Sequence, residues 1–185
     1  FLNDMIQANP ALLSLGLDAT QLGTQTWLDN RLVEIDISGA AHEITTLPSS
    51  VSNLTYLRDL RLYSMDISML PNEIRYLFNL EDLYLGYNHS LVSLPDNLSS
   101  LINLKDLDLT SCNFSIFPGS IFDLVGLEDL HMSYNELTSL PANFCSLPSG
   151  DVDCGACHID LRNNNLCEEY HYDCIDEWEP QDCQE

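Results

Sequence analysis

The chain has 185 residues, enough for one domain with a sizeable hydrophobic core. Six basic against 29 acidic side chains give a formal net charge of -23, so the chain would repel nucleic-acid phosphates and nucleic-acid binding is not expected. Apolar residues make up 45% of the chain, too many for acidic disorder, and no uncharged stretch exceeds 14 residues, too short to span a bilayer. Leucine alone accounts for 33 residues, an excess that calls for a periodic explanation.

Residues 1–31 are predicted to form an N-terminal helical cap. Asn9-Pro10 interrupts an apolar start that includes Phe1 and Ile6, and further leucines lead to Trp27. This pattern predicts short helical pieces that cover the open edge of the first strand of the region that follows. The segment has no cysteine, so we expect packing alone to hold it. Because the chain begins at Phe1 rather than Met, we expect a removed leader or a longer parent protein.

Residues 32–166 repeat one phrase, Leu-x-x-Leu-x-Leu, in exact or degenerate form. The central apolar residues of successive copies are Ile35, Leu60, Leu83, Leu107, Leu130 and Ile159, at steps of 25, 23, 24, 23 and 29 residues. Between the copies, Leu-Pro or Phe-Pro precedes apolar residues three and six positions further on. Each copy predicts a short strand with inward leucines, and successive strands are predicted to stack as a parallel sheet.

The phrase resembles the leucine-rich repeat family, whose units read LxxLxLxxNxLxxLPxxIxxLxN. The resemblance implies an α/β fold: a short horseshoe solenoid of five to six repeats, with a parallel β-sheet on the concave face and a cap at each end. It also implies a non-enzymatic module that binds a protein or peptide through that face.

The ninth position of the unit is normally Asn, whose side chain bonds backbone groups of the turn after the strand. In this chain the ninth positions are Asn88, Asn135 and Asn164, but Ala40, Met65 and Cys112 in the other repeats. We therefore interpret Cys112 as a buried free thiol in one of these slots. The Asn88 side chain is expected to face inward, which makes it a poor glycan acceptor despite its sequon.

The remaining cysteines gather near the C-terminus, at Cys145, Cys154, Cys157, Cys167, Cys174 and Cys183. Their concentration predicts disulfides, of undetermined pairing, that pin an acidic C-terminal cap over residues 167–185 in an oxidising compartment. Sequons at Asn53, Asn97 and Asn113 are predicted glycosylation sites. Together these features predict an extracellular chain, secreted or on the cell surface.

Solvent-facing strand positions provide the candidate ligand surface. The third positions read Glu34, Asp59, Asp82, Asp106, Asp129 and His158. Stacked strands would place five of these carboxylates in one column at about 4.8 Å spacing, which costs stability unless it is offset. The candidate ligand-binding residues are Glu34, Asp59, Arg61, Asp82, Tyr84, Tyr87, Asp106, Asp108, Asp129, His131 and Tyr134.

Three interpretations of the acidic column stay open. Arg58, Arg61, Lys105 and Arg162 fall on the same face, which favours pairing within the molecule. A basic partner protein or peptide, or a bound Ca²⁺, are the functional alternatives.

Cys154-Gly-Ala-Cys157-His158 matches the C-x-x-C-H string that attaches c-type haem. Residues 156–161 already serve as a repeat strand, so disulfides are favoured, with haem or zinc as an alternative. No phosphate loop or nucleophile elbow occurs, and neither catalytic residues nor a cofactor are predicted. The predicted function is partner recognition at the concave face. The alternative is a structural subunit that self-assembles into an extracellular fibre or matrix, with cations as one way to offset its charge.

Overall fold

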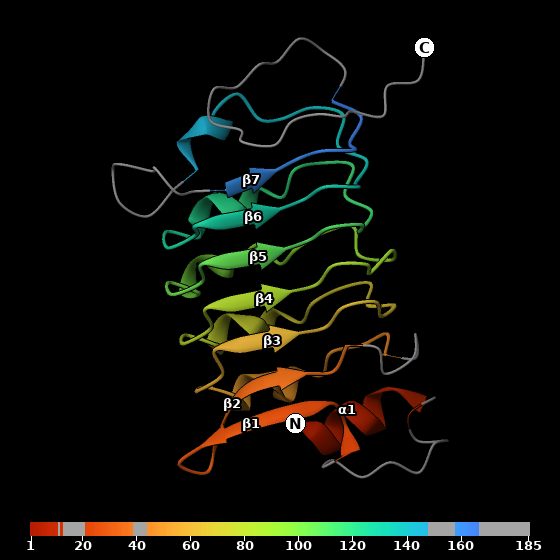
Figure 1. The fold of residues 1–185 in the computed structure, drawn as a ribbon, viewed down its shortest axis with the longest axis vertical. Helices are drawn as coiled ribbons and strands as arrows, with labels where there is room; N and C mark the ends of the chain where they lie inside the picture. Colours follow the sequence, from red (N-terminus) through yellow and green to blue (C-terminus); the bar gives the residue numbers. More distant parts are fainter. Residues whose placement is uncertain (11, 13–20, 39–43, 148–157, 167–185) are drawn as a thin grey trace.

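The computed structural model of the chain describes residues 1–10, 12, 21–38, 44–147 and 158–166. Seven strands lie side by side in one sheet, in the order of the chain (Figure 1). They are β1 (Thr24–Leu28), β2 (Arg31–Asp36), β3 (Asp59–Arg61), β4 (Asp82–Tyr84), β5 (Asp106–Asp108), β6 (Asp129–His131) and β7 (His158–Asp160). From β2 to β7 every pair is parallel, which confirms the predicted solenoid.

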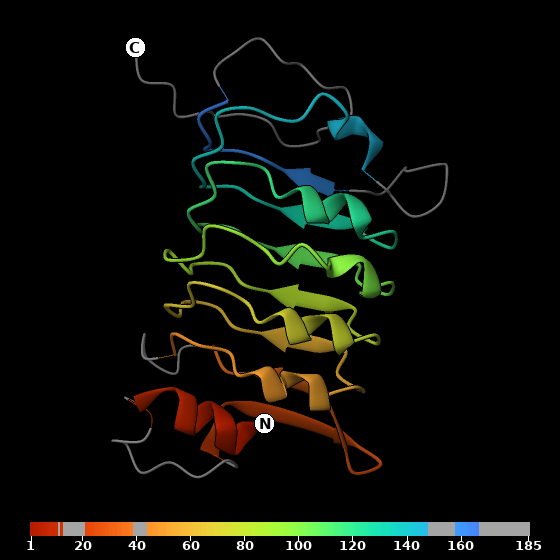
Figure 2. The same cartoon turned by 180° about the vertical axis from the view of Figure 1, so that it is seen from behind.

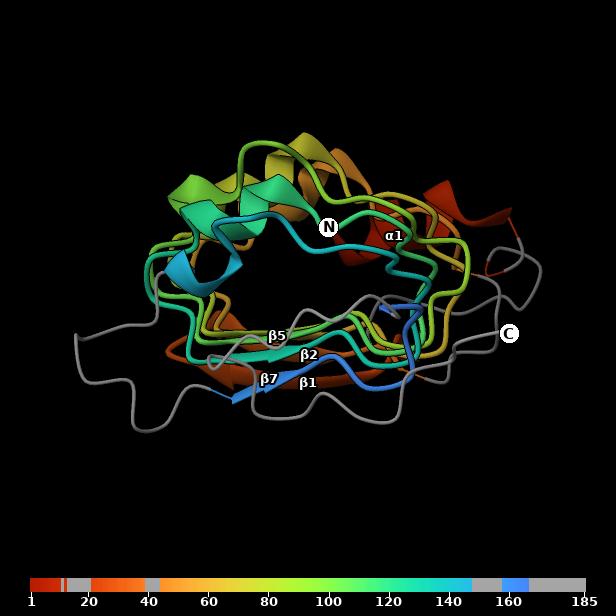
Figure 3. The same ribbon diagram turned by 90° about the horizontal axis from the view of Figure 1, so that it is seen from above.

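Short 3-10 helices cover the other side of the core, opposite the sheet (Figures 2 and 3). They are η2 (Ser49–Asn53), η3 (Asn72–Tyr76), η4 (Leu98–Ser100), η5 (Gly119–Asp123) and η6 (Phe144–Ser146). A proline directly precedes η2, η3 and η5, where its fixed φ suits the start of a helical turn. The apolar residue three positions after each proline is fully buried, so this phrase of the repeat closes the core from behind.

One continuous apolar core lies between the two layers and runs from Met5 to Leu166. Successive strand residues point to opposite faces, so Leu60, Leu83 and Leu107 are buried while the residues between them stay on the outer face. Each repeat contributes one such layer and contacts mainly its neighbours, which is why a single repeat would not be stable alone.

At the N-terminal end, α1 (Leu2–Ala8) lies on the same side as the 3-10 helices (Figure 2). Asn9, directly after α1, is fully buried. Its Nδ2 donates to the Met5 carbonyl at 2.8 Å and the Thr46 carbonyl at 3.0 Å, and its Oδ1 accepts from the amides of Thr45 and Thr46. Hydrogen bonds therefore add to the apolar packing that was expected to hold this end alone.

The predicted helical character of the N-terminal region is wrong for Trp27, which belongs to strand β1. That strand pairs antiparallel with β2 through a turn at Asp29 and Asn30, whose φ angles are 49° and 60°. Asp and Asn tolerate this left-handed geometry, which matches the twist of a two-residue hairpin. The threonines of β1 favour strand over helix, a local signal that outweighs the scattered leucines before it.

Within the described ranges, no helix has the length and apolar character needed to cross a membrane.

Candidate functional site

A ladder of buried asparagines runs along the turns that follow the strands. Nδ2 of Asn88 donates to the Leu62 carbonyl at 2.8 Å and the Leu85 carbonyl at 2.6 Å, and its Oδ1 accepts from the Ile67 amide. Asn135 and Asn164, two and three repeats further on, show the same arrangement, and each has its side-chain oxygen and nitrogen bonded. Each Asn ties two adjacent repeats together, and its interior position leaves Asn88 unsuited to carry a glycan.

Cys112 occupies the ladder slot between Asn88 and Asn135 as a free, buried thiol. Its Sγ lies 3.4 Å from the Leu85 carbonyl, and burial raises the pKa of the thiol to about 12. In the slots that hold Asn, the side-chain oxygen accepts a hydrogen bond from a backbone amide in the turn of the preceding repeat. Here the corresponding amide, that of Leu91, already donates to the Asn88 carbonyl at 2.9 Å. The step from Leu83 to Leu107 has 24 residues, and its extra residue lets this turn bond its own amide. A Cys in the slot therefore leaves no amide of the turn without an acceptor.

The third-position residues form one row across the outer face of the sheet, which we call the acidic row: Glu34, Asp59, Asp82, Asp106 and Asp129. Each faces the next in strand register, and His158 on β7 continues the row beside Asp129. At the spacing of adjacent strands, about 4.8 Å, like charges directly opposite each other repel.

Among the described residues, the lysine and arginines pair with one member of this row, Asp59. Arg61 forms a bidentate pair with Asp59, with N–O distances of 2.6 to 3.1 Å. Arg58 and Lys105 lie instead near Glu81, at 3.9 and 3.5 Å, and Arg162 pairs with Asp160. Pairing within the molecule thus neutralises Asp59 and leaves Asp82 and Asp129 without a cation among the described residues.

Asp106 lies at the centre of the acidic row and is only partly satisfied. Its Oδ2 accepts from the Tyr84 hydroxyl at 2.9 Å, while Oδ1 is buried, has no hydrogen-bond partner within the described residues and lies 4.0 Å from His131 Nε2. Burial raises the pKa of Asp106. Burial and the neighbouring carboxylates of Asp59 and Asp106 also raise the pKa of Asp82. The surroundings of Asp82 and Asp106 therefore disfavour the charged form of these two carboxyl groups.

Two stacked tyrosines line the acidic row on the side where the strands end. The rings of Tyr63 and Tyr84 lie 5.6 Å apart, and Tyr63 donates its hydroxyl to Asp108 Oδ2 at 2.7 Å. The ring of Tyr63 lies so close to Gly86 that an added Cβ there would come within 2.9 Å of it. The Arg61 guanidinium also sits over the Tyr84 ring, 5.1 Å from its centre, in a cation–π contact.

The fifth-position acids bond the turns that follow the strands. Asp108 Oδ1 accepts from the Thr110 amide at 2.7 Å, so both of its oxygens are bonded. Asp36 and Asp160 accept from the amide two residues later in the same way. His131, between Asp108 and Asp160 in register, faces His158 with ring centres 5.4 Å apart.

The remaining predicted residues lie away from the acidic row. Tyr87 and Tyr134 lie beyond the ends of β4 and β6, both at positive φ and with 48% and 60% of their surface exposed. Of the predicted glycosylation sites, Asn53 and Asn113 are exposed and Asn97 is half-buried. Cys145 is disulfide-bonded. The other five cysteines of the predicted staples, and with them the C-x-x-C part of the haem string, lie outside the described residues.

Sequence reasoning missed Tyr63, Glu81 and Asn9. Tyr63 stands at the seventh position of its repeat, two residues after Arg61, so strand alternation could have placed it on the outer face. Glu81 stands at the second position between Arg58 and Lys105 of the adjacent repeats, a pattern of opposite charges in register that was visible in the sequence. Asn9 gave no such signal, since its partners are backbone groups 36 and 37 residues away.

Comparisons with known proteins found a matching family model and similar solved structures. Residues 103–124 and 126–147 match the family model described as Leucine Rich Repeat. A leucine-rich repeat protein of Leptospira interrogans has a similar solved structure, with 26% identity, a TM-score of 0.56, and coverage of 78% of this chain and 40% of that chain. The plant peptide hormone receptor RGFR1 in complex with RGF2 aligns with 20% identity and a TM-score of 0.43, over 80% of this chain and 33% of that chain. This chain therefore spans less than half of either. No curated protein matches.

Proposed function

Because the matched repeats and the Leptospira structure support the leucine-rich repeat family, a common protein–protein interaction fold, we propose that this chain is a non-enzymatic recognition module that binds a basic protein or peptide on the outer face of its sheet. The observation that carries this proposal is the acidic row. Four aspartates lie in register on adjacent strands, and among the described residues only the first of them, Asp59, is paired with an arginine or lysine.

A basic partner would reduce the repulsion among the carboxylates of the acidic row. The raised pKa values of Asp82 and Asp106 mean that their charges are unfavourable in the free protein. Arginine or lysine side chains of a partner would offset the charge of these carboxylates from the outer face of the sheet. The rings of Tyr84 and His131 flank the row and would give such a partner apolar surface to contact.

We further propose that the protein acts in an oxidising, extracellular setting. Cys145 is disulfide-bonded, and six of the seven cysteines lie between residues 145 and 183. Structural disulfides persist in secreted proteins and are rare in reducing compartments. Mass spectrometry of the protein recovered from its native source should find three disulfides and one free thiol, whereas more than one free thiol would contradict the extracellular assignment.

Binding of a fluorescent hexa-arginine peptide tests the proposed surface. Replacing Asp82 and Asp129 together by Asn should weaken binding about tenfold, because each lost carboxylate removes a contact worth on the order of 0.7 kcal/mol. The matched control replaces two exposed acids on the opposite side, Asp96 just before η4 and Asp123 in η5. That control changes the net charge equally, so equal losses in both variants would contradict a specific surface.

A further inference from the structure

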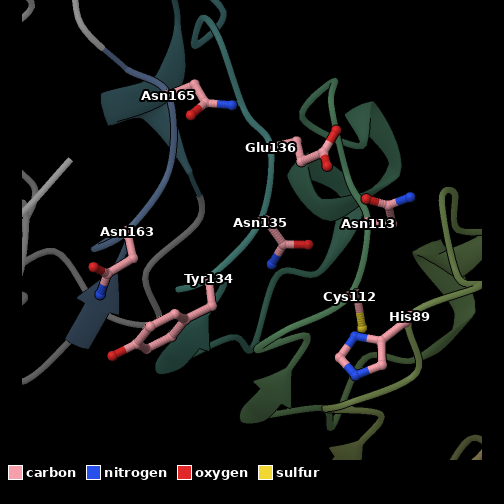
Figure 4. A pocket seen from close by; sticks show the side chains of 8 residues that line it. All are labelled: His89, Cys112, Asn113, Tyr134, Asn135, Glu136, Asn163 and Asn165. Atoms are coloured by element: carbon pink, nitrogen blue, oxygen red, sulfur yellow. The ribbon is translucent and has the colours of Figure 1, made fainter. Parts of the chain in front are cut away.

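A second recognition feature lies at the edge of the solenoid, beyond the ends of the strands and separate from the acidic row. It is a hollow of about 540 Å³, which we call the edge pocket (Figure 4). Its floor includes Cys112 and Asn135 of the ladder. Its walls carry six polar side chains: His89, Asn113, Tyr134, Glu136, Asn163 and Asn165. Four of these are the tenth-position residues of successive repeats, so the solenoid itself sets them in one row along the edge.

The floor of the edge pocket is committed to the fold. The Asn135 amide is bonded to three backbone carbonyls and one backbone amide, and Cys112 is 6% exposed. The wall side chains differ in this respect. Within the described residues, none of the six wall side chains makes a hydrogen bond or ion pair to the protein. Their donors and acceptors therefore remain available to a ligand that replaces the water on them.

The chemistry of these walls selects a class of ligand. Three carboxamides each offer both a donor and an acceptor, and Glu136 adds an acceptor. Among the described residues, no lysine or arginine lines the pocket, which disfavours phosphate and carboxylate ligands. Two exposed rings line the pocket, Tyr134 and the more polar His89, and together they offer too little apolar surface for a wholly apolar compound. A neutral saccharide fits these walls. Its hydroxyl groups both donate and accept hydrogen bonds around the ring, and its C–H face is apolar.

We propose that the edge pocket binds a neutral saccharide of one or two rings. Its volume falls within the range of about 300 to 1,000 Å³ typical of small-molecule sites. Figure 4 shows Tyr134 turned toward Asn163 at one end, and the Asn165 amide directed toward the side of Glu136 at the other. The Tyr134 ring packs against the C–H face of the sugar, while the carboxamides of Asn163 and Asn165 and the carboxylate of Glu136 bond its hydroxyls.

The sugar has two possible sources. Asn113 begins a sequon and lines the pocket itself, so a glycan attached to its side chain would start inside the hollow. Otherwise the saccharide is free or belongs to a glycosylated partner. Both sources present the same chemistry to the walls, and the experiment below separates them.

Saturation-transfer NMR on protein produced in bacteria, which carries no glycan, tests binding with three probes: the disaccharides chitobiose, cellobiose and mannobiose. At least one should receive saturation on its ring protons, and Tyr134→Ala and Asn163→Ala should each abolish it. The control is Tyr87→Ala, which removes an exposed tyrosine of the same repeat position and backbone geometry outside the pocket. Absence of transfer to all three probes, or equal loss in the Tyr87 variant, would overturn the proposal.

Protein secreted from eukaryotic cells then identifies the source. If the pocket holds the chain's own glycan, the secreted protein should transfer no saturation to the probe that binds the bacterial protein, and Asn113→Gln from the same cells should restore it. If the saccharide comes from elsewhere, secreted wild type and Asn113→Gln should transfer equally. Because the acidic row contributes no side chain to the pocket, neither result depends on hexa-arginine binding.

Discussion

The asparagine ladder and the acidic row cross the same repeats but treat polar groups in opposite ways. In the ladder, Asn88, Asn135 and Asn164 are buried and their side-chain amides are bonded to backbone groups of adjacent repeats. In the row, Asp82, Asp106 and Asp129 face like charges at strand spacing, and one buried oxygen has no partner among the described residues. The ladder therefore supports the fold, whereas the row is expected to cost stability and is the surface that we propose for a partner.

The largest effect should come from the ladder. Asn135→Ala should lower the free energy of unfolding by about 3 kcal/mol, because it leaves buried groups such as the Leu109 carbonyl and the Phe114 amide unbonded. Urea denaturation measures the change. The contrast between the ladder and the outer face of the sheet would fail if this variant lost no more stability than Tyr63→Phe.

Tyr63→Phe should cost about 1 kcal/mol, since it removes one hydrogen bond to a partly buried carboxylate and keeps the ring stacked on Tyr84. Asp108 still accepts a hydrogen bond from the Thr110 amide, so its carboxylate is not left without a donor. Denaturation of the variant beside Asn135→Ala ranks the two regions. A cost near 3 kcal/mol would mean that the outer face supports the fold as strongly as the ladder does.

Cys112→Asn should change the stability by less than about 1 kcal/mol, although it restores the residue usual at this position. The new Nδ2 could donate to the Leu85 carbonyl, but the Leu91 amide that the new oxygen would need is already bonded within its own turn. Thermal unfolding measures the difference. A gain of 2 kcal/mol would show that the extra residue of this turn does not explain the cysteine.

Asp82→Asn should have the smallest effect and the opposite sign, a gain of about 0.5 kcal/mol at neutral pH from removing repulsion along the row. The pKa of Asp82 is raised in the folded state, so its penalty exists where the residue is ionised and disappears as the pH falls through that raised pKa. The gain should therefore vanish on acidification. A loss of stability at neutral pH would show that Asp82 has a favourable partner in the free protein.

Much of this architecture was legible in the sequence. The spacing of Leu60, Leu83 and Leu107 placed the strands, and the third positions gave the acidic row in its observed register. The repeat carries this information because each unit is a copy of one local structure that packs on its neighbours.

The rest depended on contacts that no repeat encodes. Asn9 bonds backbone groups that adjoin it only in space, and β1 arises from a hairpin outside the repeated phrase. The edge pocket was not predicted because its walls belong to turns rather than strands. Tyr87 and Tyr134 were expected on the outer face of the sheet as continuations of the strands. In the structure β4 and β6 end three residues before them, and both residues lie in turns at positive φ.

The most direct test of the acidic row combines its cost and its use in one thermal melt. We compare wild type with the Asp82→Asn, Asp129→Asn double variant, each with and without saturating hexa-arginine. Without the peptide the variant should melt higher than wild type, because like-charge repulsion is gone. With the peptide, wild type should gain stability by ligand binding and the variant should gain much less. An equal gain in both proteins, or a variant that melts lower without peptide, would contradict the account.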